Sequence, residues 1–505
     1  MSQETSVKTP RQSIIFRFQR YGHRKFPLII PDPYAKEDLK ILQKRDEEEN
    51  AKTEPPSDEL IDLRCIWAVE FYTPSQVAQL LSGFEKLGWD REDIRNRISP
   101  SIWVQSFRET PLASGSFNFG AIHRPGDKRS LSTHGWTALL PPCVDYAFAS
   151  MYSLTSSITC IVMCFILDEK YSGRFDERLR HKYKTVLEPI AGGGYRLLNP
   201  PWQKTAAIQA IRAEMRAAVA NWFRTQLPGL FASGIIEDEF PTCEFVTLHK
   251  AQPFPNKDEG DQASKEWLSL LDMDHGFYAW LAEKSPGLKF VWPPLRDKGS
   301  RFHATIAARE DAFSKQALQR YGGGGRQSCV FYVNQRVSGL LSRWGLLCML
   351  SGFERCINNM RDSATLKPVQ RGKPPLYLLR ELTGYLSQSM DIAPVSADLQ
   401  HLAEQNAIFE HGLEIFKPGD SHFYRDKGIT LGQVWREGIR RRSVWLENID
   451  RSARDLLIQY GTVIGSHENI KLQKRIGKLT WILVLLTAVL AYLTYCTLLS
   501  HSATL

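Results

Sequence analysis

The C-terminal end of the chain holds the feature that most constrains its architecture. Residues 479–499, LTWILVLLTAVLAYLTYCTLL, contain no charged side chain. A helix of this length reaches about 30 Å at about 1.5 Å per residue, which is the thickness of a bilayer's hydrocarbon core. Trp481 lies near one end, and Tyr492 and Tyr495 lie toward the other, where interfacial aromatic residues are common. We therefore expect one transmembrane helix rather than a buried core helix.

The residues on either side of this stretch predict its orientation. Four basic residues stand before it: Lys471, Lys474, Arg475 and Lys478. The segment after it, SHSATL, has no Lys or Arg. By the positive-inside rule we expect a single-pass membrane protein with its N-terminal body in the cytoplasm and a lipid bilayer as its partner. A pore built from self-associated spans is a weaker alternative, because 479–499 offers no charged residue to an ion pathway.

A second uncharged stretch, residues 146–167, is also long enough to cross a membrane. It is rich in hydroxyl side chains, its middle residues 154–157 (LTSS) have the composition of a turn, and acidic residues flank it at Asp145 and Asp168. Two strands of a buried hairpin explain this pattern better than a second span. Both interpretations stay open at this point.

A net charge of +9 could indicate a protein that binds nucleic acid, but the positions of the basic residues argue against this. Their excess is concentrated in residues 1–25 and 435–478, and the rest of the chain is close to neutral. The main body therefore lacks the charge expected of a protein that binds a phosphate backbone, and no nucleic-acid partner is expected for it.

The nine cysteines are scattered and form no CxxC pair. Four of them lie inside apolar runs, at Cys160, Cys164, Cys329 and Cys348. A free cysteine in such a run behaves as a small hydrophobic residue, so this usage fits a reducing compartment better than a disulfide framework.

The N-terminal 58 residues are expected to be a basic and charged, flexible segment. Residues 41–59 read as a charged linker that contains proline, and no apolar signal-peptide core precedes them. Residues 13–26, SIIFRFQRYGHRKF, are basic and aromatic. They could contact anionic lipid or RNA, act as an organellar presequence, or form a tail packed on the body.

The fold proper is predicted to begin with a strand followed by a capped helix. Apolar and other residues alternate from Leu63 to Phe71, which is the period of a strand. Thr73 and Pro74 then provide a helix start, and Gly88 provides the helix end. Strands that follow in hairpin-like and helix-separated order predict an α+β fold with a mixed sheet.

Further elements and domains follow from the same patterns. Strands are expected at 115–122, 144–152, 158–167, 242–249, 302–308 and 329–333, and helices at 175–187, 203–226, 376–390 and 397–415. The expected domains are an α+β globular domain over 59–333, a helical region over 334–428, a long stalk helix over 429–478 and the transmembrane helix over 479–499. In the helical region, an apolar stripe from Val337 to Cys348, interrupted by Arg343, predicts a core helix rather than a span.

The stalk carries apolar residues at alternating steps of three and four, the pattern of a coiled coil. They are Leu446, Ile449, Ala453, Leu456, Tyr460, Val463, His467 and Ile470. This heptad seam could pack on the chain's own body, which is slightly favoured, or pair with a second copy to form a homo-oligomer.

One short segment groups potential metal ligands. Asp272, Asp274 and His275 lie within four residues, and a metal site would need one or two further ligands such as His249 or His303. An Asp-rich turn that caps a helix is the commoner reason for such a segment. These residues are therefore weak candidates for a metal site, and catalytic and cofactor-binding residues are undetermined.

Two glycine runs could cradle a phosphate on backbone N–H groups, at 192–194 and at 322–325. Neither is followed by the Lys-Ser/Thr of a P-loop, and no GxGxxG opens a helix. Flexible joints explain both runs better.

Taken together, these patterns favour a non-enzymatic, membrane-anchored sensor, scaffold or effector that assembles through its stalk. The alternative is a membrane-tethered, metal-dependent hydrolase or nuclease that uses the Asp272–His275 cluster. The substrate or ligand, any cofactor, the membrane and the number of copies are not determined by the sequence.

Overall fold

The computed structural model describes most of the chain. The described residues are 35–91, 98–110, 113–127, 135–189, 195–234, 240–255, 263–292, 302–313, 325–366, 389–420 and 424–502, with isolated residues at 18, 21, 22, 25, 236, 318, 319 and 422. Most of the N-terminal segment 13–26, the glycines 192–194 and 322–324, and most of the expected helix 376–390 lie outside them.

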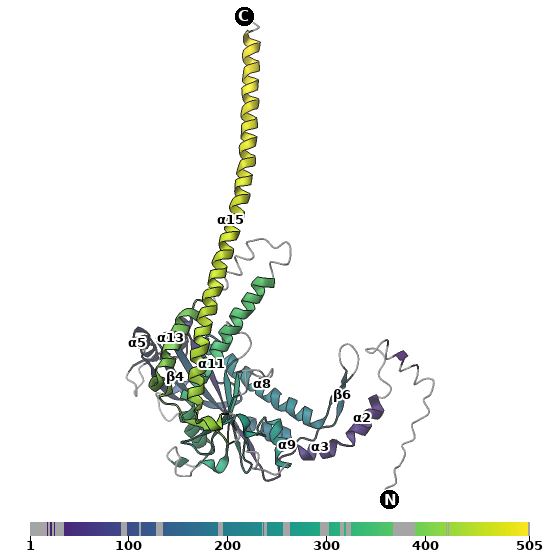
Figure 1. Cartoon of the computed structure of the whole chain (residues 1–505). Helices are drawn as coiled ribbons and strands as arrows, with labels where there is room; N and C mark the ends of the chain where they lie inside the picture. Colours follow the sequence, from purple (N-terminus) through teal and green to yellow (C-terminus); the bar gives the residue numbers. More distant parts are fainter. Residues whose placement is uncertain are drawn as a thin grey trace. The chain divides into compact units, whose positions relative to one another are not determined.

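The chain divides into two compact units. The first, unit 1, comprises Met1–Leu350 and Asp398–Arg441. The second, unit 2, comprises Ser351–Ala397 and Arg442–Leu505. Two long helices, α11 (Arg326–Leu366) and α15 (Leu431–Ser502), contribute residues to both units (Figure 1).

Unit 1 is built on a ten-stranded mixed sheet, which confirms the α+β prediction. Its strand order is β12-β9-β10-β11-β8-β1-β5-β4-β2-β3. The strands are β1 (Ile61–Tyr72), β2 (Gly115–His123), β3 (Trp136–Thr137), β4 (Val144–Thr155), β5 (Ile158–Leu167), β8 (Thr242–Leu248), β9 (Ala279–Ala282), β10 (Lys289–Val291), β11 (His303–Arg309) and β12 (Phe416–Pro418). The pairs β8–β11 and β2–β3 are parallel, and the others are antiparallel. The central order β8-β1-β5-β4 is that of a split βαβ sheet.

Strand β1 lies in the middle of the sheet and is buried on both faces, although its sequence alternates. A bulge between Leu63 and Cys65 shifts its register. After the bulge, Ile66 and Ala68 join the hydrophobic core that also contains helix α8 (Pro200–Gln226). On the opposite face Trp67 donates a hydrogen bond from Nε1 to Asn334 of α11, 2.8 Å away. Both faces are covered, so the polar half of the alternation does not face water.

The 146–167 stretch is a hairpin, which resolves the alternative of a second span. Strand β4 pairs with β5 antiparallel along nearly its whole length, and every residue of β5 is buried. The turn at 156–157 falls where the hydroxyl-rich composition predicts it. Hydroxyl groups near this turn accept and donate hydrogen bonds that a bilayer core would not supply.

The structure also confirms the predicted capped helix after β1. Thr73 and Gln76 form a capping box around a short 3-10 turn, Pro74–Gln76, that leads into α4 (Val77–Lys86). Gly88 follows with φ +67°, a conformation that favours glycine.

One expected strand was wrong. Residues 329–333 are part of helix α11 and not a strand, because Cys329, Val330 and Val333 continue at helical spacing into the apolar stripe from Val337. A short apolar run does not by itself distinguish strand from helix, which explains the error.

The expected helix 175–187 ends early. Helix α7 spans Arg174–Arg180, and residues from Val186 to Pro189 form strand β6 instead. Strand β6 pairs with β7 (Tyr195–Leu198) in a separate two-stranded sheet. This pairing with a later segment outweighs the local helical pattern.

The described part of the chain contains further helices. They are α2 (Ala35–Gln43), α3 (Asp46–Lys52), α5 (Pro100–Glu109), α6 (Glu169–Ser172), α9 (Ala263–Leu270), α13 (Ile392–Glu404) and α14 (Asn406–Glu410), with 3-10 turns at Gly276–Tyr278, Glu310–Ala312 and Arg425–Lys427. The expected helix 397–415 is thus two shorter helices followed by β12. The cysteines Cys160, Cys164, Cys329 and Cys348 are buried and form no disulfide bond, as the sequence predicts.

Helix α15 is continuous from unit 1 through the apolar C-terminal segment. Leu431, Trp435 and Ile439 are buried in unit 1, and Leu446 and Asp450 are buried in unit 2. The side chains of the heptad seam at Leu456, Tyr460, Val463 and His467 lie outside the described ones. Among the described residues, one helical segment is long and apolar enough to cross a membrane, Asn469–Thr494, and it is 0% buried.

The close approach of α11 to β1 gives a test of this packing. A Cβ at Gly345 would lie 2.7 Å from Phe71 Cε2 and 2.9 Å from Val69 Cγ1, whereas a Cβ at Gly438 in α15 would meet Leu347 Cδ2 at 3.6 Å. We expect Gly345→Ala to lower the free energy of unfolding by about 1–2 kcal/mol through overpacking. The control Gly438→Ala should raise it by up to about 1 kcal/mol through helix propensity. Chemical denaturation of both variants measures this, and an equal gain in both would contradict the packing.

Candidate functional site

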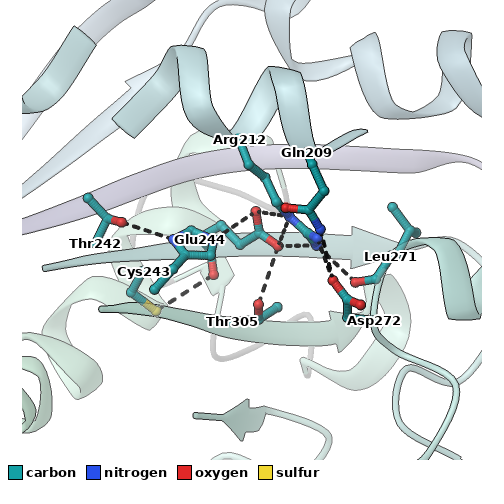
Figure 2. Close-up of polar contacts among 9 residues, drawn as sticks. Gln209, Arg212, Thr242, Cys243, Glu244, Leu271, Asp272 and Thr305 are labelled. Carbon is teal, nitrogen blue, oxygen red and sulfur yellow. Dashed lines mark hydrogen bonds and ion pairs between the residues drawn. The ribbon is translucent and has the colours of Figure 1, made fainter. Parts of the chain in front are cut away.

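Helix α8 and strand β8 bring two opposite charges together inside unit 1. Asn199 caps α8 and Pro200 starts it, and the helix buries Arg212 among apolar side chains on its sheet-facing side. Every residue of β8 is buried, the strand lies between β1 and β11, and Glu244 lies in its middle. Arg212 Nη2 lies 2.7 Å from Glu244 Oε1, and Arg212 Nε lies 3.1 Å from Oε2. Figure 2 shows this paired contact between the helix and the strand.

The same arginine reaches the loop after α9. Its Nη1 donates to Asp272 Oδ2 at 2.7 Å, and its Nη2 donates to the carbonyl oxygen of Leu271 at 2.8 Å. Gln209, one turn earlier on α8, donates to the same Asp272 oxygen at 3.2 Å (Figure 2). The guanidinium therefore joins α8, β8 and the loop in one network, and its N–H groups are directed at three acceptors within the protein.

The neighbouring strand β11 completes the surroundings of Glu244. Thr305 donates from its hydroxyl to Glu244 Oε1 at 3.3 Å. His303 Nε2 lies 3.3 Å from Glu244 Oε2 but without the alignment of a hydrogen bond, and His303 Nδ1 lies 2.9 Å from the hydroxyl of Thr242. We call Arg212, Glu244, Asp272 and His303 the buried charge cluster.

The protonation of the cluster follows from these contacts. Burial alone would raise the pKa of Glu244, but the charge of Arg212 outweighs burial, with a further contribution from His303 at acid pH where the imidazole is protonated. Together they hold the pKa of Glu244 down at about 2. Burial lowers the pKa of His303, and the opposing effect of Glu244 does not restore it. The cluster is thus an ionised Arg212–Glu244 pair beside a neutral imidazole at neutral pH.

The loop that carries Asp272 has an unusual backbone. Asp272 has φ +60° and Phe254 has φ +51°, a region that non-glycine residues seldom adopt. The two segments are joined because Phe254 N donates to the carbonyl oxygen of Met273 at 2.9 Å, and Gly276 N donates to that of Pro255 at 3.0 Å. The hydrogen bond from Arg212 to Asp272 is a third interaction that holds this loop. Such strain persists only where the surroundings fix the conformation.

The structure separates the candidate metal ligands into different contacts. Asp272 pairs with Arg212, Asp274 Oδ2 lies 2.8 Å from His275 Nδ1, and His303 faces Glu244. His249 Nδ1 lies 2.9 Å from Glu310 on another part of the sheet. Across the part of the chain that the structure describes, no three His, Cys, Asp or Glu residues gather in a group that could hold a metal ion.

Arg212 and Glu244 were missed by the sequence analysis, although a signal for them exists. Arg212 falls on the apolar face of α8 between Ile211 and Met215, and Glu244 interrupts the buried run of β8. A charged residue in each of two buried faces predicts a pair, because burying either charge alone is costly. The sequence does not say which charges are partners, since 32 positions separate these two.

A second buried acid, Glu70 on β1, has a different role. Its Oε1 accepts hydrogen bonds from the backbone N–H groups of Phe71 and Phe231, and its Oε2 accepts one from Ala232. Burial raises its pKa to about 8 despite these bonds. A Cβ at Gly229 would lie 2.5 Å from the carbonyl oxygen of Phe71 and 2.7 Å from Glu70 Cγ, so the 229–232 loop passes very close to the strand. Glu70 fastens that loop to the sheet.

The comparisons with known proteins add no family to these observations. No family model matches the chain, and no curated protein or solved structure matches it. The interpretation of the buried charge cluster therefore depends on its own geometry.

Removal of one partner tests the pairing. We expect Arg212→Met to lower the free energy of unfolding by about 3–5 kcal/mol, because Glu244 is left buried without its counter-charge. The double variant Arg212→Met/Glu244→Leu should recover most of this loss, because no unpaired charge remains. Denaturant unfolding of the wild type, both single variants and the double variant measures the coupling. Additive losses would contradict it.

The low pKa of Glu244 predicts a pH dependence of stability. The folded-state pKa of about 2 lies below the ordinary value of 4.5, so the pair stabilises the fold above pH 4.5 and loses this contribution as the pH falls toward 2. The loss amounts to about 3 kcal/mol. Unfolding free energies of the wild type and Glu244→Gln, measured from pH 7 to pH 2, should converge at acid pH. A constant difference over this range would argue against an ionised pair.

Proposed function

We propose that this chain is a membrane-anchored, non-enzymatic sensor, scaffold or effector whose copies assemble through helix α15. The observation that carries the proposal is the continuity of α15. It runs 72 residues from Leu431, buried in unit 1, to Ser502, and it includes the exposed apolar segment Asn469–Thr494.

The environment of that segment supports membrane insertion. Leu479 is 64% exposed and Trp481 is 72% exposed, and no residue of the helical segment Asn469–Thr494 is buried. Removing such an apolar surface from water is favourable by about 25 cal/mol per Å². An exposed apolar surface of this length is therefore expected to be covered by another molecule. A soluble core helix would be covered by its own protein, and this one is not. A lipid bilayer is the covering that matches its length, and the basic flank favours a cytoplasmic location for the body.

The part of α15 between Asp450 and the uncharged stretch 479–499 supports assembly. Asp450 is the last fully buried side chain described on α15, and the helix continues with exposed Ile458 and Ile470 among polar residues. The heptad seam passes through this segment. Copies inserted in one membrane in the same orientation would run their α15 helices in parallel, which is the arrangement in which identical heptads match in register.

The polar contacts of unit 1 support a non-enzymatic role. Several of its buried ionisable side chains make contacts that join elements of the fold: Arg212 with Glu244, Glu70 with backbone N–H groups, and Arg343 of α11 with the carbonyl oxygen of Phe409. These contacts stabilise loops and helices against the sheet. The alternative, a metal-dependent hydrolase or nuclease, would need Asp272, Asp274 and His275 to share a metal, and no contact among the described residues favours it.

One experiment tests anchoring and assembly together. Membranes from cells that produce the full chain are washed with alkaline carbonate and then treated with an amine cross-linker before detergent is added. We expect the chain to stay in the membrane and to give a discrete cross-linked oligomer. Leu456→Asp, on the seam, should reduce the oligomer to monomer. Association would bury an unpaired carboxylate at a heptad position, which is unfavourable.

The matched control is Ile458→Asp, which places the same charge about 200° away around the helix. It should leave the oligomer intact. Release of the wild-type chain by carbonate would refute the anchor, and an unchanged or absent oligomer in all forms would refute assembly through the seam.

A further inference from the structure

The basic residues that directly precede the uncharged stretch 479–499 lie on one face of helix α15. At about 100° per residue, Lys474, Arg475 and Lys478 lie about −60°, +40° and −20° from Lys471, within an arc of about 100°. The opposite side of the same turns carries Leu472 and Ile476, which are 54% and 55% exposed. We call Lys471, Lys474, Arg475 and Lys478 the basic face.

Several basic residues earlier on α15 have acidic partners on the same helix. Arg440 bonds Glu437 at 2.9 Å, and Arg451 bonds Glu447 at 2.9 Å. Arg454 bonds Asp450 at 2.7 Å. Each partner is three or four residues away, which is the spacing at which helix side chains meet.

Three members of the basic face, Lys474, Arg475 and Lys478, have no acidic residue at this spacing along the helix. Residues 469–505 contain no Asp or Glu, and the nearest acid before them, Glu468, is six residues from Lys474. Lys474, Arg475 and Lys478 therefore have no carboxylate within one turn along α15. The counter-charge for these three residues has to come from outside the helix.

The position of the face identifies the source, on the premise that the proposed membrane insertion is correct. Lys478 immediately precedes the uncharged stretch, and Lys471 lies about 10 Å further from it along the axis. This interval corresponds to the polar headgroup layer beside a hydrocarbon core of about 30 Å. Long basic side chains at this level extend toward lipid phosphates.

We propose that the basic face binds the headgroups of anionic phospholipids in the leaflet on the N-terminal side of the span, in preference to zwitterionic lipids. The arc concentrates four positive charges on one side of the helix, so adjacent anionic headgroups can be held there together. The preference is electrostatic and weakens as salt screens the charges.

The test uses the full chain reconstituted in phosphatidylcholine bilayers that contain a trace of spin-labelled phosphatidylserine or spin-labelled phosphatidylcholine. Electron spin resonance measures the fraction of each lipid that the protein restricts. We expect phosphatidylserine to associate at least about threefold more strongly than phosphatidylcholine at low salt. The ratio should fall toward one in about 1 M salt.

The decisive variant replaces Lys471, Lys474, Arg475 and Lys478 by Gln, and its ratio should be close to one. The matched control removes the same charge from exposed positions outside the basic face, with Lys427, Arg440, Arg441 and Arg451 replaced by Gln, and should keep the wild-type ratio. A wild-type ratio near one, an unchanged ratio in the basic-face variant, or a ratio insensitive to salt would each overturn the proposal.

The same spectra separate this proposal from the proposed function. If both labelled lipids are restricted equally, the chain is inserted and the headgroup preference alone is wrong. If neither lipid is restricted by the wild-type chain, insertion itself has failed and both proposals fall. Should the variant lose insertion, the salt titration of the wild-type chain still decides the preference.

Discussion

The pairing of Arg212 with Glu244 is the interaction on which the centre of unit 1 depends. Two charges inside a buried helix face and a buried strand are tolerable only when each neutralises the other and their remaining hydrogen-bonding groups are used. Here the guanidinium also reaches Asp272 and the carbonyl oxygen of Leu271. One side chain thus fixes the helix, the strand and a strained loop relative to one another. Burying both charges offsets much of their attraction, so the loss of one partner costs far more than replacing both by apolar residues.

The sequence predicted the parts of the fold that depend on neighbouring residues. Strand β1 and the helix after it were predicted because alternation, Thr73, Pro74 and Gly88 are local signals with local physical causes. The turn between β4 and β5 was favoured for the same reason. Full burial of β1 was not predicted, because it depends on α11 and α8, which come more than a hundred residues later in the sequence.

The errors and omissions have the same origin. Strand β6 replaces the end of a predicted helix because it pairs with β7, a contact that local propensity does not contain. The run at Cys329 was taken for a strand because five apolar residues do not reveal their period. In the candidate site, Asp272 was recognised only as a weak candidate metal ligand, beside the commoner interpretation as part of an Asp-rich turn. Its partner Arg212 was not foreseen, because it lies 60 positions away in the sequence. Spacing along the chain predicts a group of ligands only when the fold keeps them facing one another.

Along α15 the charged residues change from acid–base pairs to basic residues alone and then to none. A helix that lies in a single environment would not require this order. In the first part of α15, acids three or four residues away neutralise Arg440, Arg451 and Arg454. Nearer the apolar segment the acids cease while the basic residues continue, and then all charges cease. A helix wholly in water has no reason to drop acids before bases. A helix that passes from water through a layer of phosphate groups into hydrocarbon has a reason at each step, because the surroundings supply first water, then negative charge, then no polar partner at all. The order in which the charges disappear therefore supports the bilayer more strongly than the apolar length alone.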